Sequence, residues 1–505
     1  MLYIPRDHHC GCGIHFRFLD VPEESKIMEA STAKMKTSHI AILPSPGMGH
    51  LIPLAELAKR LIHYHFSITI IIPTDGTLSK ATKELLDDLP KSINSVVLPP
   101  AKLDDLGELK PMARISQTMI RSLPFLREVF NVLSTTTPFT ALVVDQFSTV
   151  AFDVAKEFKI SPYIFVLTAA MVASWMLHMP KIDEMYSCEY RDLQNPIKLP
   201  GCVALHGKDL FRPLQDRKGE CYKWFLYHCK RFAMAEGILV NSFMDLETSS
   251  INAITEGKDF NVPPVYPIGP LVKGVSNDGV DVHNCLKWLD DQPHSSVLFV
   301  SFGSGGSLSP EQLTELAFGL ELCQQRFLLV VRSPTRKSPN ANFFDAQSTE
   351  DPFASLPKGF LERTKGMGLV VPSWAPQIQV LSHASTGGFL THCGWNSTLE
   401  SIVQGVPLIV WPLYAEQRMN AVMLAQEMKV ALRPAVGEDG IVGREEIAAV
   451  VKCLMEGEEG KRLWNRIREL KDAAAKALSE DGSSTQSLLE VTHKWKAKAN
   501  RIKKP

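Results

Sequence analysis

The chain alternates short apolar runs with longer amphipathic ones, and this alternation limits the folds it can adopt. Residues 38–43 (SHIAIL) are apolar and end at Pro44, which is typical of a buried parallel strand. A helix is predicted to open at about Leu51, because apolar residues recur at helical spacing from there. A second apolar run follows at residues 66–72 (FSITIII). Strand, helix and strand in this order predict a βαβ unit and therefore a parallel sheet.

The same alternation continues along the rest of the chain, with an irregular stretch before residue 237. Further predicted strands cover residues 95–99, 140–144, 162–167, 237–241, 296–301, 327–331, 369–371, 389–391 and 408–410. Further predicted helices cover residues 112–133, 149–158, 443–456, 459–478 and 484–499. The second half therefore repeats the plan of the first.

A chain of 505 residues is too long for one ordinary core, so two domains are expected. A passage rich in proline and glycine, residues 263–283, is the best candidate for the linker between them. We predict an α/β fold of two doubly wound, Rossmann-like domains that face one cleft. The predicted segments are a disordered N-terminal extension at 1–35, domains at 36–262 and 284–480, and a C-terminal helix at 481–505 that packs back on the first domain.

Composition and charge argue against several classes of function. The formal net charge of −1 argues against nucleic-acid binding. No apolar run approaches the ~18 residues of a membrane-spanning helix, and the N-terminus lacks the order of a signal peptide. Ten cysteines without a pairing rhythm indicate reduced thiols and a cytoplasmic location. His8, His9, Cys10 and Cys12 form a metal-like cluster that nothing downstream completes, so no metal site is expected.

A histidine and an aspartate are candidates for acid–base chemistry. In open parallel sheets, ligands bind beyond the carboxyl ends of the strands, where His50 and Asp145 both lie. A neighbouring carboxylate would fix the imidazole tautomer and stabilise the imidazolium, and a pKa of about 6.5 suits a general base. Spacing alone favours the plainer interpretation, a loop histidine and a strand-end aspartate that do not meet.

The segment 374–417 combines aromatic, amide, imidazole and carboxylate groups, which suits an extended anionic ligand. His392 follows a predicted strand, and Asn396 and Ser397 are capping-type residues at a predicted helix start. A helix start offers free N–H groups and a partial positive charge, so it can bind phosphate. Ser304 in the Gly-rich turn SFGSGGS is a second phosphate candidate.

Competing motifs are missing from the sequence. It contains no P-loop G-x-x-x-x-G-K-[ST] and no G-x-S-x-G elbow, and its glycines do not complete G-x-G-x-x-G. The poor glycine fingerprint weakens the alternative of a dinucleotide-dependent oxidoreductase. No D-x-D pair is present to hold a divalent metal ion. Protein N–H groups and side chains would therefore have to neutralise a departing diphosphate.

The segment 374–417 resembles the plant secondary product glycosyltransferase box along its whole length. The turn PSPGMGHLIP is similar to the N-terminal catalytic segment of the plant UDP-glycosyltransferases, and the similarity extends from about Lys36 to the C-terminus. Residues 332–365 resemble the long insertion of family 72, and in particular of its hydroquinone glucosyltransferases (arbutin synthases). This resemblance implies a GT-B fold with His50 as the base and Asp145 as its partner.

The resemblance also implies a role for each residue of the donor site. Trp374 would stack on uracil, Ala375 would bind the base through its backbone, Gln377 would lie near base and ribose, and Glu400 would accept both ribose hydroxyls. The residues matched to the diphosphate are Ser304, His392, Asn396 and Ser397; those matched to the sugar are Trp395, Glu416 and Gln417; Phe147 and Trp175 are candidate walls of the acceptor pocket.

UDP-glucose is the expected donor, because Gln417 matches the residue associated with glucose rather than galactose. Many family members carry Asp where this chain has Glu416, although family 72 shows Glu. The implied reaction is inverting transfer to small phenols such as hydroquinone, monolignols or xenobiotic phenols, without a metal or redox cofactor. The alternatives are a flavonoid O-glucosyltransferase and a sugar-nucleotide-binding protein that does not catalyse. We expect a monomer that neither binds nucleic acid nor spans a membrane.

Overall fold

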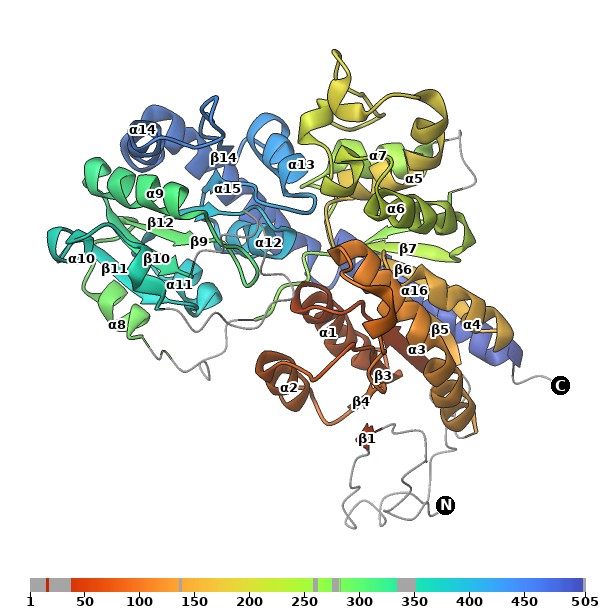
Figure 1. The fold of residues 1–505 in the computed structure, drawn as a ribbon. Helices are drawn as coiled ribbons and strands as arrows, with labels where there is room; N and C mark the ends of the chain where they lie inside the picture. The colour runs from red at the N-terminus through yellow and green to blue at the C-terminus, as the bar shows by residue number, and fades with distance from the viewer. Residues whose placement is uncertain are drawn as a thin grey trace, which may run out of the picture.

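The computed structural model describes residues 15–17, 38–135, 139–257, 262–274, 281, 283–333 and 351–502. Over these ranges the chain forms two separate sheets, each flanked by helices, that lie side by side (Figure 1). The predicted α/β fold with two Rossmann-like domains is confirmed. The predicted N-terminal extension lies outside the described residues except for the short strand at 15–17.

The N-terminal sheet has eight strands in the order β1-β4-β3-β2-β5-β6-β7-β8, and every pairing except β1 with β4 is parallel. Its central strands β2 and β5 are buried throughout, which explains why most of their residues are apolar. The strands are β1 His15–Arg17, β2 His39–Leu43, β3 Ser67–Ile72, β4 Ile93–Val97, β5 Phe139–Asp145, β6 Ser161–Val166, β7 Gly237–Val240 and β8 Val265–Pro267.

The C-terminal sheet has six strands in the order β11-β10-β9-β12-β13-β14, all parallel. The order turns back beside β9, and ligands of such sheets bind at the carboxyl ends of the strands next to this switch. The strands are β9 Val297–Ser301, β10 Arg326–Val331, β11 Gly368–Pro372, β12 Thr386–Thr391, β13 Leu408–Val410 and β14 Ala431–Leu432.

Helices connect the strands of both sheets. They are α1 Met48–Ile62, α2 Lys80–Asp87, α3 Pro111–Ser134, α4 Phe152–Glu157, α5 Ala170–Met185, α6 Glu220–Arg231, α7 Thr248–Glu256, α8 Cys285–Asp290, α9 Pro310–Cys323, α10 Phe360–Arg363, α11 Gln377–Ser382, α12 Trp395–Gln404, α13 Gln417–Val422, α14 Arg444–Glu456, α15 Glu458–Ala477 and α16 Ser483–Ile502. None of the described helices is long and apolar enough to cross a membrane.

Three sequence predictions about these elements are wrong. The first helix begins at Met48 rather than near Leu51, because Gly47 adopts a φ of 122° and turns the chain early. The stretch taken as irregular contains α5 and α6. Most of α5 is apolar and buried, which hides the helical period on which the prediction depended. Strand β8 lies inside the predicted linker and pairs with β7, so the first sheet extends to Pro267.

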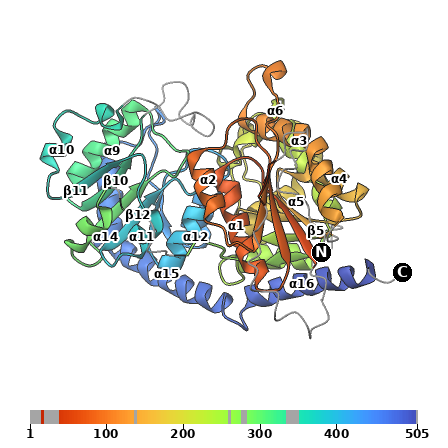
Figure 2. The same ribbon diagram turned by 90° about the horizontal axis from the view of Figure 1, so that it is seen from below.

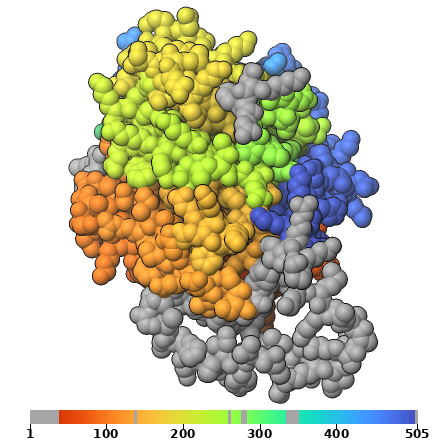
Figure 3. Space-filling model, turned by 90° about the vertical axis from the view of Figure 1, so that its right-hand side faces the viewer, coloured from red at the N-terminus to blue at the C-terminus, as the bar shows by residue number. Residues whose placement is uncertain are grey.

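The C-terminal helix α16 leaves the C-terminal half and runs beneath the N-terminal sheet (Figure 2). It packs against β5 and β8. Trp495 is buried there in edge contacts with Phe66 and Tyr163, at ring-centroid distances of 5.8 and 5.2 Å. On the molecular surface the blue C-terminal residues lie against green and orange segments of the N-terminal half (Figure 3). The helix therefore connects the two halves on the side of the sheet away from the carboxyl ends of the strands.

Candidate active site

His50 and Asp145 meet, although 95 positions separate them in the sequence. Strands β2 and β5 are neighbours in the sheet, so their carboxyl ends open at the same edge. Asp145 is the last residue of β5, and His50 lies in the first turn of α1 directly after β2. The imidazole Nδ1 and the carboxylate Oδ2 are 3.0 Å apart, at hydrogen-bond distance.

Asp145 is completely buried, and three further donors surround its carboxylate. The backbone N–H and the hydroxyl of Ser45 donate to Oδ2 and Oδ1 at 2.5 and 2.7 Å, and the N–H of Phe147 donates to Oδ1 at 2.9 Å. Burial alone would raise the pKa of Asp145, but His50 and the hydrogen bonds from Ser45 hold it below its ordinary value. The ionised carboxylate keeps the proton of His50 on Nδ1, which leaves Nε2 to accept a proton from a ligand.

The segment 374–417, predicted to bind the donor, contributes the start of α12. This helix begins at Trp395 after Gly394, and no side chain of the described chain caps it. Asn396 and Ser397 are therefore first-turn residues rather than caps, which corrects the sequence prediction. Their backbone N–H groups precede the first intrahelical hydrogen bond, from Thr398 to Gly394. Such a start can bind an anion.

Two hydrogen bonds join this helix start to the N-terminal half. The amide of Asn396 donates to the backbone oxygen of Gly49 at 3.3 Å, and the indole N–H of Trp395 donates to that of Asn241 at 2.7 Å. Within α1, the oxygen of Gly49 would normally accept from the residue four positions later. That residue is Pro53, which has no N–H. The proline thus leaves the Gly49 oxygen available for the contact across the cleft.

His392 lies in a narrow space between two glycines. A Cβ at Gly303 would approach the ring to 2.5 Å, and so would a Cβ at Gly394. Burial lowers the pKa of His392 to about 4, so the ring is neutral at physiological pH. Ser304, another predicted phosphate contact, follows Gly303 directly. The structure therefore places the predicted phosphate residues around one point at the ends of β9 and β12.

The residues predicted to bind the nucleoside also lie together. Trp374 is 55% exposed, which suits a ring that stacks on a ligand rather than one packed in a core, whereas Ala375 is buried. The Gln377 amide donates to Ser397 Oγ at 2.9 Å and to Glu400 Oε2 at 2.6 Å. Burial raises the pKa of Glu400 to about 7, which the bond from Gln377 opposes.

One of the predicted sugar-binding residues, Glu416, lies near enough to His50 for the two charges to affect each other. Burial raises the pKa of Glu416, and the charge of His50 acts in the opposite direction, so the two groups are near each other. The side-chain oxygen of Gln417 accepts the N–H groups of Leu413 and Tyr414, both at 2.8 Å. These bonds hold the loop after β13 in place. Trp395, the third predicted sugar residue, is buried, and its indole N–H already donates to the backbone oxygen of Asn241.

The two predicted acceptor-pocket residues have different surroundings. Phe147 follows Asp145 by two positions, and its ring centroid is 5.8 Å from that of His50 and 6.4 Å from that of Phe211. Trp175 is 1% exposed inside the N-terminal core. Its role as a pocket wall remains a prediction. Sequence reasoning missed Ser45, although its place between β2 and His50 was a signal that it could reach the catalytic edge.

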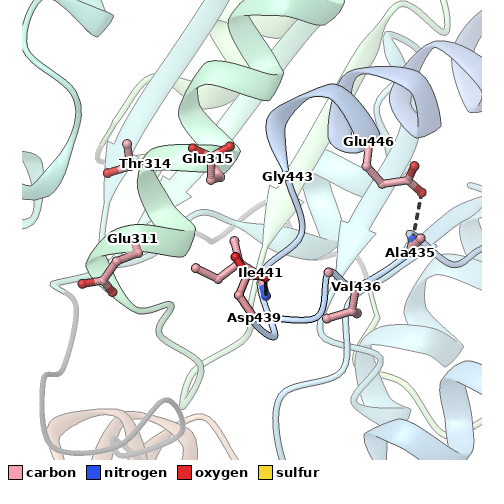
Figure 4. Close-up of a pocket in the computed structure, with 10 residues that line it drawn as sticks. Glu311, Thr314, Glu315, Ala435, Val436, Asp439, Ile441, Gly443 and Glu446 are labelled. Atoms are coloured by element: carbon pink, nitrogen blue, oxygen red, sulfur yellow. Dashed lines mark hydrogen bonds between the residues drawn. The ribbon is translucent and has the colours of Figure 1, made fainter.

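A separate hollow of about 700 Å³ lies on the C-terminal half, between α9 and the loop that leads into α14 (Figure 4). Its acidic groups have partners: Glu315 pairs with Arg444, and Glu446 accepts the N–H of Ala435 at 2.8 Å. None of the predicted site residues lines this hollow. Among the described residues, no group of three or more His, Cys, Asp or Glu is placed to hold a metal ion. The predicted cluster at residues 8–12 lies outside the described residues.

Comparison with known proteins points to one family. A family model described as "UDP-glucoronosyl and UDP-glucosyl transferase" matches residues 240–465. Hydroquinone glucosyltransferase of Rauvolfia serpentina is 59% identical over 464 residues, which cover 92% of this chain and 98% of that protein. The chain belongs to the plant UDP-glycosyltransferases. UDP-glycosyltransferase 72B1 of Arabidopsis thaliana is 57% identical, with 92% of this chain and 97% of that protein covered.

A solved structure of another glycosyltransferase has the same fold. Phytolacca americana UGT2, complexed with UDP-2fluoro-glucose and pterostilbene, matches with a TM-score of 0.84 at 51% identity. The match covers 92% of this chain and 100% of that one. The predicted GT-B arrangement and the resemblance to family 72 are therefore confirmed.

The close fit of His392 predicts a strong effect of one methyl group. Gly303→Ala should lower the free energy of unfolding by about 1–3 kcal/mol, because the new Cβ would meet the imidazole and the residue has a φ of +74°. Chemical denaturation measures this difference. Gly76→Ala is the matched control, since a Cβ there meets nothing within 4 Å. Equal stability of the two variants would show that the ring is not confined as described.

Proposed function

We propose that this UDP-glycosyltransferase transfers glucose from UDP-glucose to small phenols and forms β-glucosides. The observation that carries the proposal is the His50–Asp145 pair, whose neighbour Gly49 is hydrogen-bonded to the uncapped start of α12. The Asn396–Gly49 bond fixes the distance between these two parts. The names of two relatives support the choice of substrates: one is a hydroquinone glucosyltransferase, and the other was solved with UDP-2fluoro-glucose and pterostilbene.

The proposed mechanism is a single displacement. Nε2 of His50 removes the proton from the acceptor hydroxyl, and the oxygen attacks the anomeric carbon of UDP-α-glucose. UDP departs from the opposite face, so the configuration inverts. The Asp145 carboxylate stabilises the imidazolium that forms. Phenols suit this base, because a hydroxyl with a pKa of about 10 gives up its proton far more readily than an alkyl alcohol.

The donor contacts complete the proposal. Uracil stacks on Trp374, Glu400 accepts the ribose hydroxyls, and the sugar lies at Glu416 and Gln417 beside the base. The diphosphate is held by Ser304, His392, Asn396, Ser397 and the free N–H groups of α12. Because these groups can meet the charge of the leaving group, the reaction requires neither a metal ion nor a redox cofactor. We further propose that the protein acts as a monomer in the cytoplasm.

One assay tests the activity and the assignment of the base together. Incubation with UDP-glucose and a mixed panel of phenols and flavonoids, read by mass, should give glucosides, most abundantly of simple phenols. His50→Ala should lower kcat by about 100-fold or more while UDP affinity stays almost unchanged. Asp145→Asn should lower kcat by about tenfold or more with less effect on donor affinity.

Each outcome of this assay has a distinct meaning. No glucoside from the wild-type protein, despite measurable UDP-glucose binding, would show a sugar-nucleotide-binding protein without catalysis. Preferential glucosylation of flavonoids would show a flavonoid O-glucosyltransferase rather than an enzyme for small, simple phenols. Near-normal turnover in His50→Ala would overturn its role as base. An equal loss of UDP affinity in Asp145→Asn would show that the aspartate acts on the structure instead.

Donor affinity should depend on pH through Glu400, whose pKa is raised to about 7 by burial. Only the ionised carboxylate accepts both ribose hydroxyls, so protonation below this pKa opposes binding. The affinity for UDP-glucose should fall by about tenfold between pH 8 and pH 6. His392, with a pKa of about 4, stays neutral across this range. Calorimetric titrations without acceptor measure the effect.

Glu400→Gln provides the control for this pH dependence. Its amide does not titrate, so the variant should bind UDP-glucose more weakly than the wild-type protein at pH 8, with nearly equal affinity at both pH values. If the variant retained the pH dependence of the wild-type protein, another group would be responsible.

A further inference from the structure

None of the side chains assigned above to the diphosphate carries a positive charge, and the inference drawn from this rests on the proposed function. UDP-glucose carries two negative charges on its phosphates. The side chains assigned to them are hydroxyl and amide groups, together with an imidazole that burial keeps neutral. Two carboxyl groups, Glu400 and Glu416, belong to the same proposed donor site. Dipoles and N–H groups alone would therefore have to offset the charge of the departing UDP.

Arg332 occupies the position at which a cation would meet this charge. It is the first residue after β10, at the carboxyl edge of the C-terminal sheet. Strand β10 lies between β9 and β11. The turn after β9 carries Ser304, and the turn after β11 carries Trp374, which are the proposed phosphate and uracil contacts. The strand order thus places Arg332 between the two.

The guanidinium points to the Gly-rich turn rather than to a carboxylate. Its Nη1 donates to the backbone oxygen of Gly303 at 3.2 Å and also to that of Ser304. These two bonds engage one of the three guanidinium nitrogens. No ion pair to Arg332 is found among the described residues. Burial lowers the pKa of Arg332, as expected of a cation withdrawn from water, and Tyr414 opposes this effect.

A half-buried arginine without a carboxylate partner is costly unless a ligand supplies the negative charge. The fork of a guanidinium matches two phosphate oxygens, and such charge-assisted bonds are about twice as strong as neutral ones. We propose that Arg332 binds the diphosphate of the donor and stabilises UDP as it leaves. Its bonds to the Gly303 and Ser304 oxygens aim the remaining N–H groups at the phosphates.

The test compares ligands with and without the diphosphate. Calorimetry should show that Arg332→Gln raises the Kd of UDP by about tenfold or more and that of uridine by less than about twofold. The UDP affinity of the wild-type protein should fall with rising salt concentration, and the Gln variant should show a smaller fall. kcat with UDP-glucose should also decrease, because the leaving group loses a positive partner.

Two further variants separate charge from structure. Arg326→Gln removes an exposed arginine at the opposite end of the same strand and should change neither UDP affinity nor its salt dependence. Arg332→Lys keeps the charge without the fork, so it should retain the salt dependence with intermediate affinity. The Lys variant also decides the question if the Gln variant does not fold.

The outcomes distinguish this inference from the proposed function. If the wild-type protein fails to bind UDP-glucose, the proposed function is wrong. If it binds normally while Arg332→Gln binds UDP equally well, or loses uridine and UDP affinity in the same proportion, Arg332 only supports the turn. Loss of the salt dependence in Arg332→Lys would likewise overturn the assignment.

Discussion

The site depends on one buried negative charge, the carboxylate of Asp145. An ionised group without contact to water is stable only when hydrogen bonds and an opposite charge surround it. The donors come from the turn after β2, the first turn of α1 and the chain just beyond β5. This requirement keeps β2 beside β5 and holds His50 in one orientation. The sheet of the N-terminal half, in which β2 pairs with β5, holds the His50–Asp145 contact in place.

The second requirement is that donor and base remain in register across two domains. The bonds Asn396–Gly49 and Trp395–Asn241 connect the start of α12 to the catalytic edge. A further contact joins the halves: the Arg433 guanidinium pairs with Asp209 at 2.8 Å. Helix α16 follows α15 of the C-terminal half and packs on the N-terminal sheet. A cleft linked at several points positions the anomeric carbon against the base better than a flexible hinge would.

Most of the fold and the candidate phosphate residues could be predicted from strand–helix alternation and strand-end polar residues, which are local signals. The uracil, ribose and sugar contacts are implied only by the resemblance of residues 374–417 to known glycosyltransferases. The long helix α5 could not be predicted, because most of its residues are apolar and buried and its sequence therefore shows no helical alternation of apolar and polar residues. The meeting of His50 with Asp145 depends on strand order, which spacing alone does not contain. The same holds for Arg332, whose position between the proposed uracil and phosphate contacts follows from the order β11-β10-β9. The role of Pro53 could not be predicted either. The oxygen of Gly49 that it leaves free is used by Asn396, which belongs to the other domain.

In the proposed mechanism, a base from the N-terminal half drives a single displacement at the sugar that the C-terminal half holds. The anomeric configuration of the product tests this most directly. With UDP-α-glucose and hydroquinone, proton NMR of the product formed in the first minutes should show the β-glucoside. An α-glucoside would require two displacements or attack from the same face, and it would contradict the arrangement of His50 and the donor site described above.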